Sequence, residues 1–172
     1  LKASISHAKM LYKTNLLSEI ECDRIINILN EMLFEAESGE LKIEKEFEDM
    51  HSKIEYTLIS RLGDIGKKIH TARSRNDQVL VSIQLYLIDE LNNIKTEVKS
   101  LFDLLINLAK KNEKIIMPGY THMKAAMPSS FGLWFSAYAE TLIDDIISLN
   151  STIKIVNQNT LGSAAGYGTS FN

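Results

Sequence analysis

Three polar segments carry side chains that could bind an anion or move a proton. The first is KKIHTARSRND at residues 67–77, in which four fixed cations precede one acid. Ser74, Arg75 and Asn76 bring together a hydroxyl, a guanidinium and an amide. Beside the free N–H groups of a helix start, such side chains suit a carboxylate or a phosphate. The alternative is a solvated basic turn whose polar residues only cap a helix, and this segment alone slightly favours that alternative.

The second segment, MPGYTHMKAAMP at residues 117–128, contains Thr121, His122 and Lys124. A histidine can carry a proton near neutral pH, and an adjacent threonine can hydrogen-bond a substrate oxygen. An ordinary polar loop between helices explains the same residues.

The third segment, LGSAAGYGTS at residues 161–170, has three glycines close together. Backbone amides in such a segment can approach an anion, but the glycine spacing matches neither common nucleotide-binding pattern. A flexible loop explains it equally well.

Two other histidines and the single cysteine have simpler interpretations. His51 lies one helical turn before Glu55, so a buried, hydrogen-bonded histidine or a surface pair accounts for it. The spacing gives His7 only a structural role. Cys22 falls on an apolar helix face and is interpreted as a small core residue.

The elements that must position these segments are helices. Apolar side chains recur at three- and four-residue steps over residues 22–33 and again over residues 47–62. Ser18 and Glu21 predict a capping box at the start of the first helix, and Gly63 predicts the end of the second.

Two much longer helices are predicted after them. Residues 77–112 keep the helical spacing without glycine or proline, with Asn76 or Asp77 as the N-cap, and would span roughly 50 Å. Residues 131–156 repeat the pattern after Pro128. Since strand-like alternation never exceeds a few residues, the predicted fold is all-α. Residues 1–66 form an N-terminal helical region, and residues 67–172 begin a long-helix bundle domain.

An apolar stripe along each long helix must be covered over its whole length, and a hairpin of two helices leaves outer faces open. The sequence therefore predicts a homo-oligomeric helical bundle.

Composition excludes several classes of protein. With 172 residues, 45% hydrophobic content and a formal charge of −3, the chain can bury a core but has no basic surface for nucleic acid or an anionic membrane. One cysteine and four histidines fit no zinc spacing. A single cysteine cannot form an internal disulfide, which favours a reducing, cytoplasmic setting. No membrane-spanning or secretory segment is evident. A chain that begins at Leu1 is expected to be a piece of a longer protein.

The polar segments, in this order, resemble the argininosuccinate lyase family of the fumarase/aspartase superfamily. The resemblance is carried by SRNDQV at residues 74–79, GYTHMKAAMP at 119–128 and LGSAAGYG at 161–168. EDMHSKIE at residues 48–55 and SISHAKML at residues 4–11 extend it over nearly the whole chain.

This resemblance implies a mostly helical lyase that forms a homotetramer, with each active site assembled from three subunits. The implied reaction is the reversible β-elimination of argininosuccinate to arginine and fumarate, with no metal or organic cofactor. By motif, the residues implied to contact the substrate are Ser74, Arg75, Asn76 and Thr121. His51 would help to position the substrate, and His122 would transfer a proton or orient the group that does.

The sequence departs from the family pattern in three respects. Ala72 stands where many members have glycine, and KAAMP replaces a commoner glutamine-containing ending. The family's mobile loop, with its catalytic serine base, would lie beyond Asn172, and a substrate-binding segment would precede Leu1. The chain by itself is therefore expected to be inactive.

Two alternatives stay open at this stage. One is a noncatalytic structural protein on the same scaffold, as in the lens crystallins related to this family. The other is a sister lyase that acts on another succinyl substrate such as adenylosuccinate. The intact SRND and threonine–histidine motifs favour an enzyme over the first, and the SRNDQ run disfavours the second.

Overall fold

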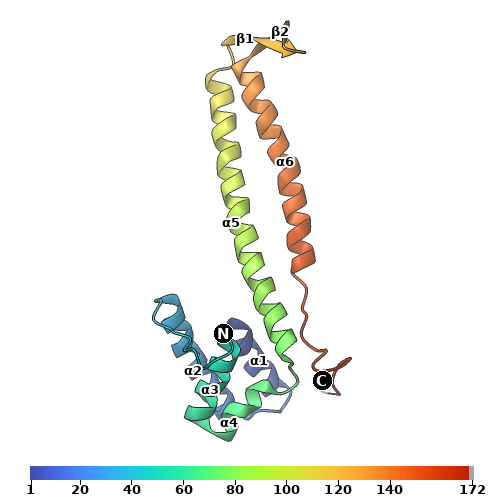
Figure 1. Ribbon diagram of the computed structural model, residues 1–172. Coiled ribbons are helices and arrows are strands. Elements are labelled where there is room, and N and C mark those ends of the chain that lie inside the picture. Colours follow the sequence, from blue (N-terminus) through green and yellow to red (C-terminus); the bar gives the residue numbers. More distant parts are fainter. Residues whose placement is uncertain (171–172) are drawn as a thin grey trace. The chain divides into compact units, whose positions relative to one another are not determined.

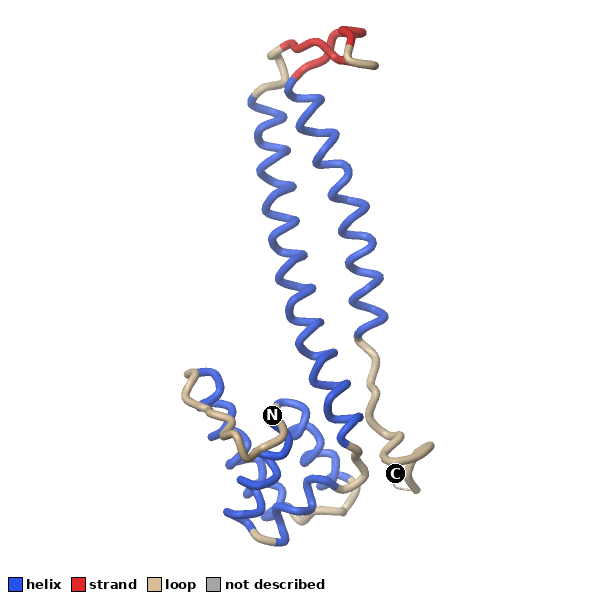
Figure 2. The backbone as a smooth tube through the Cα atoms, viewed as in Figure 1, coloured by secondary structure: helices blue, strands red, loops and turns tan. Residues whose placement is uncertain are grey.

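A computed structural model describes residues 1–170 of the chain and is mostly helical, as predicted (Figure 1). Figure 2 shows helices along most of the chain and one pair of strands between the two long helices. In order they are α1 (Lys2–Lys13), α2 (Glu19–Glu37), α3 (Met50–Leu62), α4 (Asp64–Lys67), the 3₁₀ helix η1 (Lys68–His70), α5 (Arg75–Lys111), β1 (Ile116–Thr121), β2 (Lys124–Ser130) and α6 (Phe131–Val156).

The chain divides into two compact units. The first comprises Leu1–Ile83 together with the segment that begins at Asn159, and the second comprises Gln84–Gln158. Helix α5 starts in the first unit and continues into the second. The domain boundary that the sequence predicts between residues 66 and 67 stays a prediction.

The first unit has its own hydrophobic core. The apolar faces predicted for α2 and α3 pack with α1, and the buried side chains are Ala8, Leu11, Leu17, Cys22, Ile25, Ile28, Leu29, Met32, Ile54, Leu58 and Ile69. Cys22 is 4% exposed and its Sγ donates to the carbonyl oxygen of Ala8, so its interpretation as a core residue is confirmed.

Local signals set the ends of these helices. The predicted capping box of α2 is present: Ser18 Oγ accepts from the backbone N–H of Glu21, and the Glu21 carboxylate accepts from the N–H of Ser18. Asp49 Oδ1 accepts from the N–H of Ser52 at 2.7 Å and starts α3, which ends at Gly63 as predicted.

The second unit pairs the two predicted long helices, α5 and α6, and their bounds agree with the sequence pattern to within about two residues. The sequence predicts no strand between them, but the connecting segment is an antiparallel hairpin of β1 and β2. Its register places Pro118 opposite Pro128, with an irregularity between Gly119 and Tyr120. Proline interrupts strand pairing, and these strands lack the two-residue alternation of apolar side chains, so the sequence gives no strand signal.

The start of α6 packs closely on the end of α5. Ser130 Oγ accepts from the N–H of Leu133 at 3.1 Å and caps α6. A Cβ at Gly132 would lie only 2.7 Å from Glu113 Cα and 3.0 Å from the carbonyl oxygen of Ala109. Glycine at this position therefore lets the two backbones approach.

Large apolar side chains remain exposed along both long helices. On α5 they include Leu80, Ile83, Leu87, Ile94, Leu101 and Leu104, and on α6 they include Leu133, Trp134, Tyr138, Ile143, Ile147 and Ile155. Despite this, none of the helices within residues 1–170 combines the length and apolarity needed to cross a bilayer.

Candidate functional site

The start of α5 carries the first polar segment. The predicted N-cap, Asn76 or Asp77, is wrong: Ser74 caps the helix. Ser74 Oγ accepts from the N–H of Asp77 at 3.2 Å, and Asp77 Oδ2 accepts from the N–H of Ser74 at 3.0 Å. A serine followed three residues later by an acid forms such a reciprocal box. Arg75 and Asn76 are consequently the first two helical residues.

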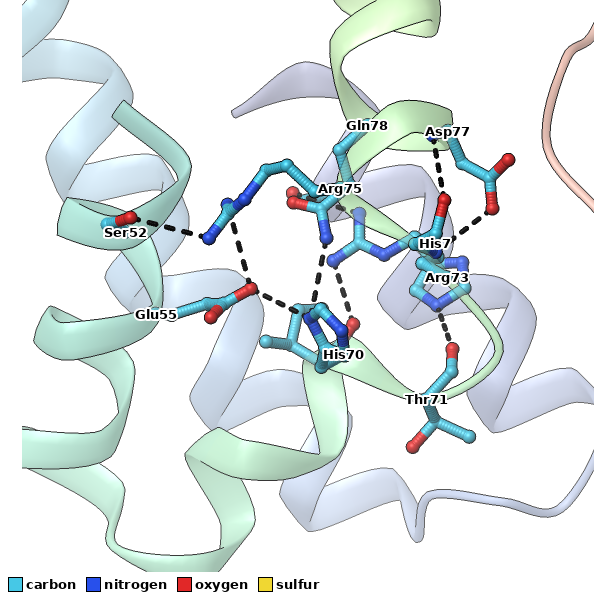
Figure 3. A network of polar contacts seen from close by, with 12 residues as sticks. His7, Ser52, Glu55, His70, Thr71, Arg73, Arg75, Asp77 and Gln78 are labelled. Carbon is cyan, nitrogen blue, oxygen red and sulfur yellow. Dashed lines mark hydrogen bonds and ion pairs between the residues drawn. The ribbon is translucent and has the colours of Figure 1, made fainter. Parts of the chain in front are cut away.

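Side chains of α3 hold the guanidinium of Arg75 (Figure 3). Arg75 Nη2 donates to Ser52 Oγ at 3.3 Å, and Arg75 Nη1 lies 3.6 Å from Asp49 Oδ1. The carboxylate of Glu55 is 3.9 Å from the same Nη1. Because Asp49, Ser52 and Glu55 follow one another at three-residue steps, a single helix face orients this cation.

Glu55 also faces His70, which closes the network drawn in Figure 3. His70 Nδ1 lies 2.8 Å from Glu55 Oε1, and Gln78 Nε2 lies 3.5 Å from the same Nδ1. One carboxylate oxygen of Glu55 thus stands between an imidazole and a guanidinium. The sequence interpretation paired Glu55 with His51 and missed both of these contacts, which join residues far apart in the chain.

Arg73 is buried, so the interpretation of residues 67–77 as a solvated turn is wrong at this position. Its side chain is 6% exposed, and it donates to the carbonyl oxygen of Ile69 at 2.7 Å and to Ser4 Oγ at 3.3 Å. Burial lowers the pKa of Arg73 to about 10, against the raising effect of the Glu55 carboxylate. This arginine ties the turn before α5 to α1.

The backbone conformation of Ala72 explains why many family members have glycine at this position. Ala72 has a φ of 59°, in the left-handed region that favours glycine. The glycine expected at this position by the family resemblance would adopt that conformation without a Cβ clash, whereas alanine adopts it with strain.

Two histidines of the first unit have lowered pKa values. His7 is 5% exposed, and its Nε2 lies 2.9 Å from the carbonyl oxygen of Thr71. Burial, together with the charge of Arg73, lowers the pKa of His7 to about 4, so this histidine is neutral near pH 7. His51 is half-buried on α3, and burial lowers its pKa although the Asp49 carboxylate acts in the opposite direction.

The glycine-rich segment contacts the start of α5. Ser163 Oγ donates to Asp77 Oδ1 at 2.8 Å, and Asp77 is 3% exposed. Burial alone would raise the pKa of Asp77, but hydrogen bonds from Ser74, Ser163 and Ala164 outweigh it and lower that pKa. The first and third polar segments are therefore in contact within one unit.

Thr121 and His122 lie in the second unit, at the tip of the hairpin. Thr121 pairs with Lys124, and the turn between them consists of His122 and Met123, whose φ values of 49° and 64° are both positive. Two such residues give the turn type that fits a two-residue hairpin, although neither is glycine or asparagine. Thr121 and His122 are exposed. Helix α5, which precedes the hairpin in the chain, has 37 residues and is about 55 Å long.

Within residues 1–170, no group of three or more histidine, cysteine, aspartate or glutamate side chains has the geometry to hold a metal ion.

The whole chain is similar to one known protein family. The family model described as lyase matches residues 1–172, the whole chain. This chain belongs to the lyase family of the fumarase/aspartase type.

Curated relatives of this lyase chain are similar over almost all of its residues. Argininosuccinate lyase of Phocaeicola vulgatus is 49% identical over 98% of the chain, and argininosuccinate lyase of Thermotoga neapolitana is 45% identical over the same share. The chain spans 38% of the first relative and 42% of the second, or about two fifths of their lengths.

Solved structures agree with the helical fold of the lyase chain. A variant of EDDS lyase with bound fumarate matches 98% of this chain and 33% of its own, with a TM-score of 0.83 and 25% identity. The fumarate lyase:delta crystallin of Brucella melitensis, bound to cobalt, matches 97% of this chain and 41% of its own with a TM-score of 0.79. At 19% identity, the second match shows the fold alone.

Proposed function

We propose that this chain forms part of an argininosuccinate lyase, which catalyses the reversible β-elimination of argininosuccinate to arginine and fumarate. The observation that carries the proposal is 45–49% identity, over 98% of the chain, to relatives of that name. Since the chain spans about two fifths of those relatives, the activity is assigned to the full-length protein that carries these residues.

The start of α5 suits the charge that the reaction develops. A base removes a proton from the carbon next to a carboxylate, the carboxylate takes up negative charge, and the carbon–nitrogen bond then breaks. Fixed donors aimed at that carboxylate stabilise this transition state. Arg75 supplies a guanidinium that the α3 region already orients, and Ser74 and Asn76 flank Arg75 in the sequence at the start of the helix.

Thr121 and His122 supply the remaining roles from the hairpin. We assign Thr121 a hydrogen bond to a substrate oxygen and His122 a part in proton transfer. His51, on α3 next to Ser52, helps to position the substrate. Since the resemblance implies an active site assembled from three subunits, His122 would reach a given site from another copy of the chain.

The exposed apolar residues of α5 and α6 support such an association. Extended apolar surface on a soluble protein marks a contact with a partner, and several side chains on each long helix are about half exposed, such as Leu101 at 46% and Ile143 at 48%. A homotetrameric bundle of the kind implied by the resemblance would cover both helices along their length.

The test is turnover by the full-length protein. Fumarate release, followed by its ultraviolet absorbance, is expected with argininosuccinate and not with adenylosuccinate. Turnover of adenylosuccinate alone would identify a sister lyase, and absence of turnover with either substrate would point to a structural homologue. The 172-residue chain alone is expected to release no fumarate, because the resemblance places the catalytic serine base outside it.

Two variants of the full-length protein test the residue roles, each with a control. His122→Asn keeps a residue that tolerates positive φ but removes the imidazole, so kcat should fall by about 100- to 10,000-fold. Met123→Gly relaxes the same turn without removing a proposed catalytic group, and kcat should stay within a few-fold of the unchanged protein.

Arg75→Lys keeps the charge but loses the planar pair of donors, so KM for argininosuccinate should rise by about tenfold or more. Arg24→Lys, at an exposed position on α2, should leave KM unchanged. Equal KM values for the two variants would exclude Arg75 as the carboxylate-binding residue.

A further inference from the structure

The carboxylate of Asp77 contacts two of the polar segments at once. Its Oδ2 accepts from the N–H of Ser74 at 3.0 Å, within the cap of α5. Its Oδ1 accepts from the hydroxyl of Ser163 at 2.8 Å, and the N–H of Ala164 also donates to this carboxylate. Asp77 and Ser163 are 86 positions apart in the sequence, so one buried side chain joins two distant segments.

Burial makes this contact consequential. Asp77 is 3% exposed, and a buried carboxylate is costly unless hydrogen bonds satisfy it. Here the donors come from both segments, and hydrogen bonds to an ionised acceptor are stronger than those between neutral groups. Separating the segments would leave part of this carboxylate without donors, so the structure favours keeping them together.

Ser163 is also the point around which the glycine-rich segment turns. Its carbonyl oxygen accepts from the N–H groups of Gly166 and Gly168, each at 3.1 Å. Residues 161–168 form turns rather than a helix or strand. The backbone of Ser163 shapes the segment, and its hydroxyl attaches the segment to α5.

We propose that Asp77 is a positioning residue that fastens residues 161–168 to the start of α5, so that the segment and the Ser74–Asn76 group present one rigid surface to the substrate. Asp77 itself does not touch the substrate. The inference relies on the proposed function for the identity of the substrate, but the contact between the two segments can be tested without it.

The first measurement is hydrogen exchange in the full-length protein. Ser163→Ala removes the hydroxyl bond to Asp77 and leaves the Ala164 N–H as the remaining donor from the segment. It also keeps the reciprocal bonds between Ser74 and Asp77, whereas Asp77→Asn weakens the bonds to both segments. Exchange of the amides of residues 161–168 should become about 10- to 100-fold faster in each variant. Ser163→Thr retains a hydroxyl and should restore slow exchange.

Two control variants match the chemistry of these changes. Asp89→Asn lies on an exposed position of α5, and Ser148→Ala lies on an exposed position of α6. Neither should alter exchange in residues 161–168. If Ser163→Ala also leaves that exchange unchanged, the proposed attachment is wrong.

The second measurement is steady-state kinetics with argininosuccinate. Ser163→Ala should raise KM by about tenfold or more with a smaller change in kcat, and Ser163→Thr should recover most of the loss. In the Asp77→Asn/Ser163→Ala double variant, the effects should be clearly less than multiplicative because both changes break the same contact. Faster exchange with unchanged KM would overturn the positioning role.

The two proposals fail in different ways. If the unchanged protein does not turn over argininosuccinate, the proposed function fails, and hydrogen exchange alone decides whether Asp77 fastens the segment. If the unchanged protein is active but the Ser163→Ala variant matches it in both measurements, the proposed function stands and this inference fails.

Discussion

Gly66→Ala tests how closely α4 must pack on α3 for the site to form. A Cβ at residue 66 would lie 2.3 Å from the carbonyl oxygen of Leu58 and 2.7 Å from the backbone nitrogen of Ile59. Ordinary contacts of a Cβ begin near 3.4 Å, so α4 would have to move away from α3 by about 1 Å. Both clashing groups are backbone, and no side-chain rotation can relieve them.

The cost follows from this displacement. Overpacking costs about 1–3 kcal/mol, and alanine recovers about 0.4–1 kcal/mol because it restricts the unfolded chain. We expect a net loss of about 1–2 kcal/mol in the free energy of opening for α3 and α4. Since α4 leads directly into η1 and His70, KM for the substrate should rise as well.

Hydrogen exchange of the full-length protein measures this opening directly. A loss of about 1–2 kcal/mol corresponds to exchange roughly 5- to 30-fold faster for the amides of residues 54–69. Gly166→Ala is the control, because a Cβ there meets nothing within 4 Å and should leave exchange in residues 54–69 unchanged. Equal exchange rates in the two variants would refute the reasoning from close backbone contact.

Three further outcomes are expected. Gly132→Ala should cost about 1–3 kcal/mol, seen as faster exchange in the first turn of α6, because its Cβ would lie 2.7 Å from Glu113 Cα. His7 has a folded pKa of about 4, below the 6.5 of the unfolded chain, so the unfolded state binds the proton first. Stability should therefore fall by up to about 3 kcal/mol between pH 6.5 and 4, and urea unfolding of His7→Gln should depend less on pH in that range. Ala72→Gly should leave the free energy of unfolding unchanged or raise it by up to about 1 kcal/mol, whereas Ala36→Gly, within α2, should lower it by about 1 kcal/mol.

The sequence predicts the helices well because their information is local. Apolar spacing defines α5 and α6 to within about two residues, and the Ser18–Glu21 pair marks the start of α2. The hairpin was missed because two opposed prolines and a turn without glycine or asparagine look like an ordinary linker. The two strands form because they pair with each other. The spacing of apolar residues within one segment carries no information about such pairing.

The candidate site is only partly readable from the sequence. The motif residues Ser74, Arg75 and Asn76 are evident, and so are Thr121 and His122. The residues that hold Arg75 and the glycine-rich segment, such as Glu55 and Asp77, have contacts that depend on tertiary packing. The burial of Arg73 was likewise invisible, because four cations in a short run are typical of a solvated turn.

The two-stranded hairpin that carries His122 is expected to be the least stable element of the described chain. Its two strands pair only with each other within the described residues, and a two-stranded sheet is marginally stable in water. If neighbouring copies complete its surroundings, dilution loosens this tip before the helices melt. In the full-length protein, the proposed lyase activity would then decline below a threshold protein concentration while the helical circular dichroism signal persists. The concentration range in which that activity is seen would be set by how tightly the copies associate.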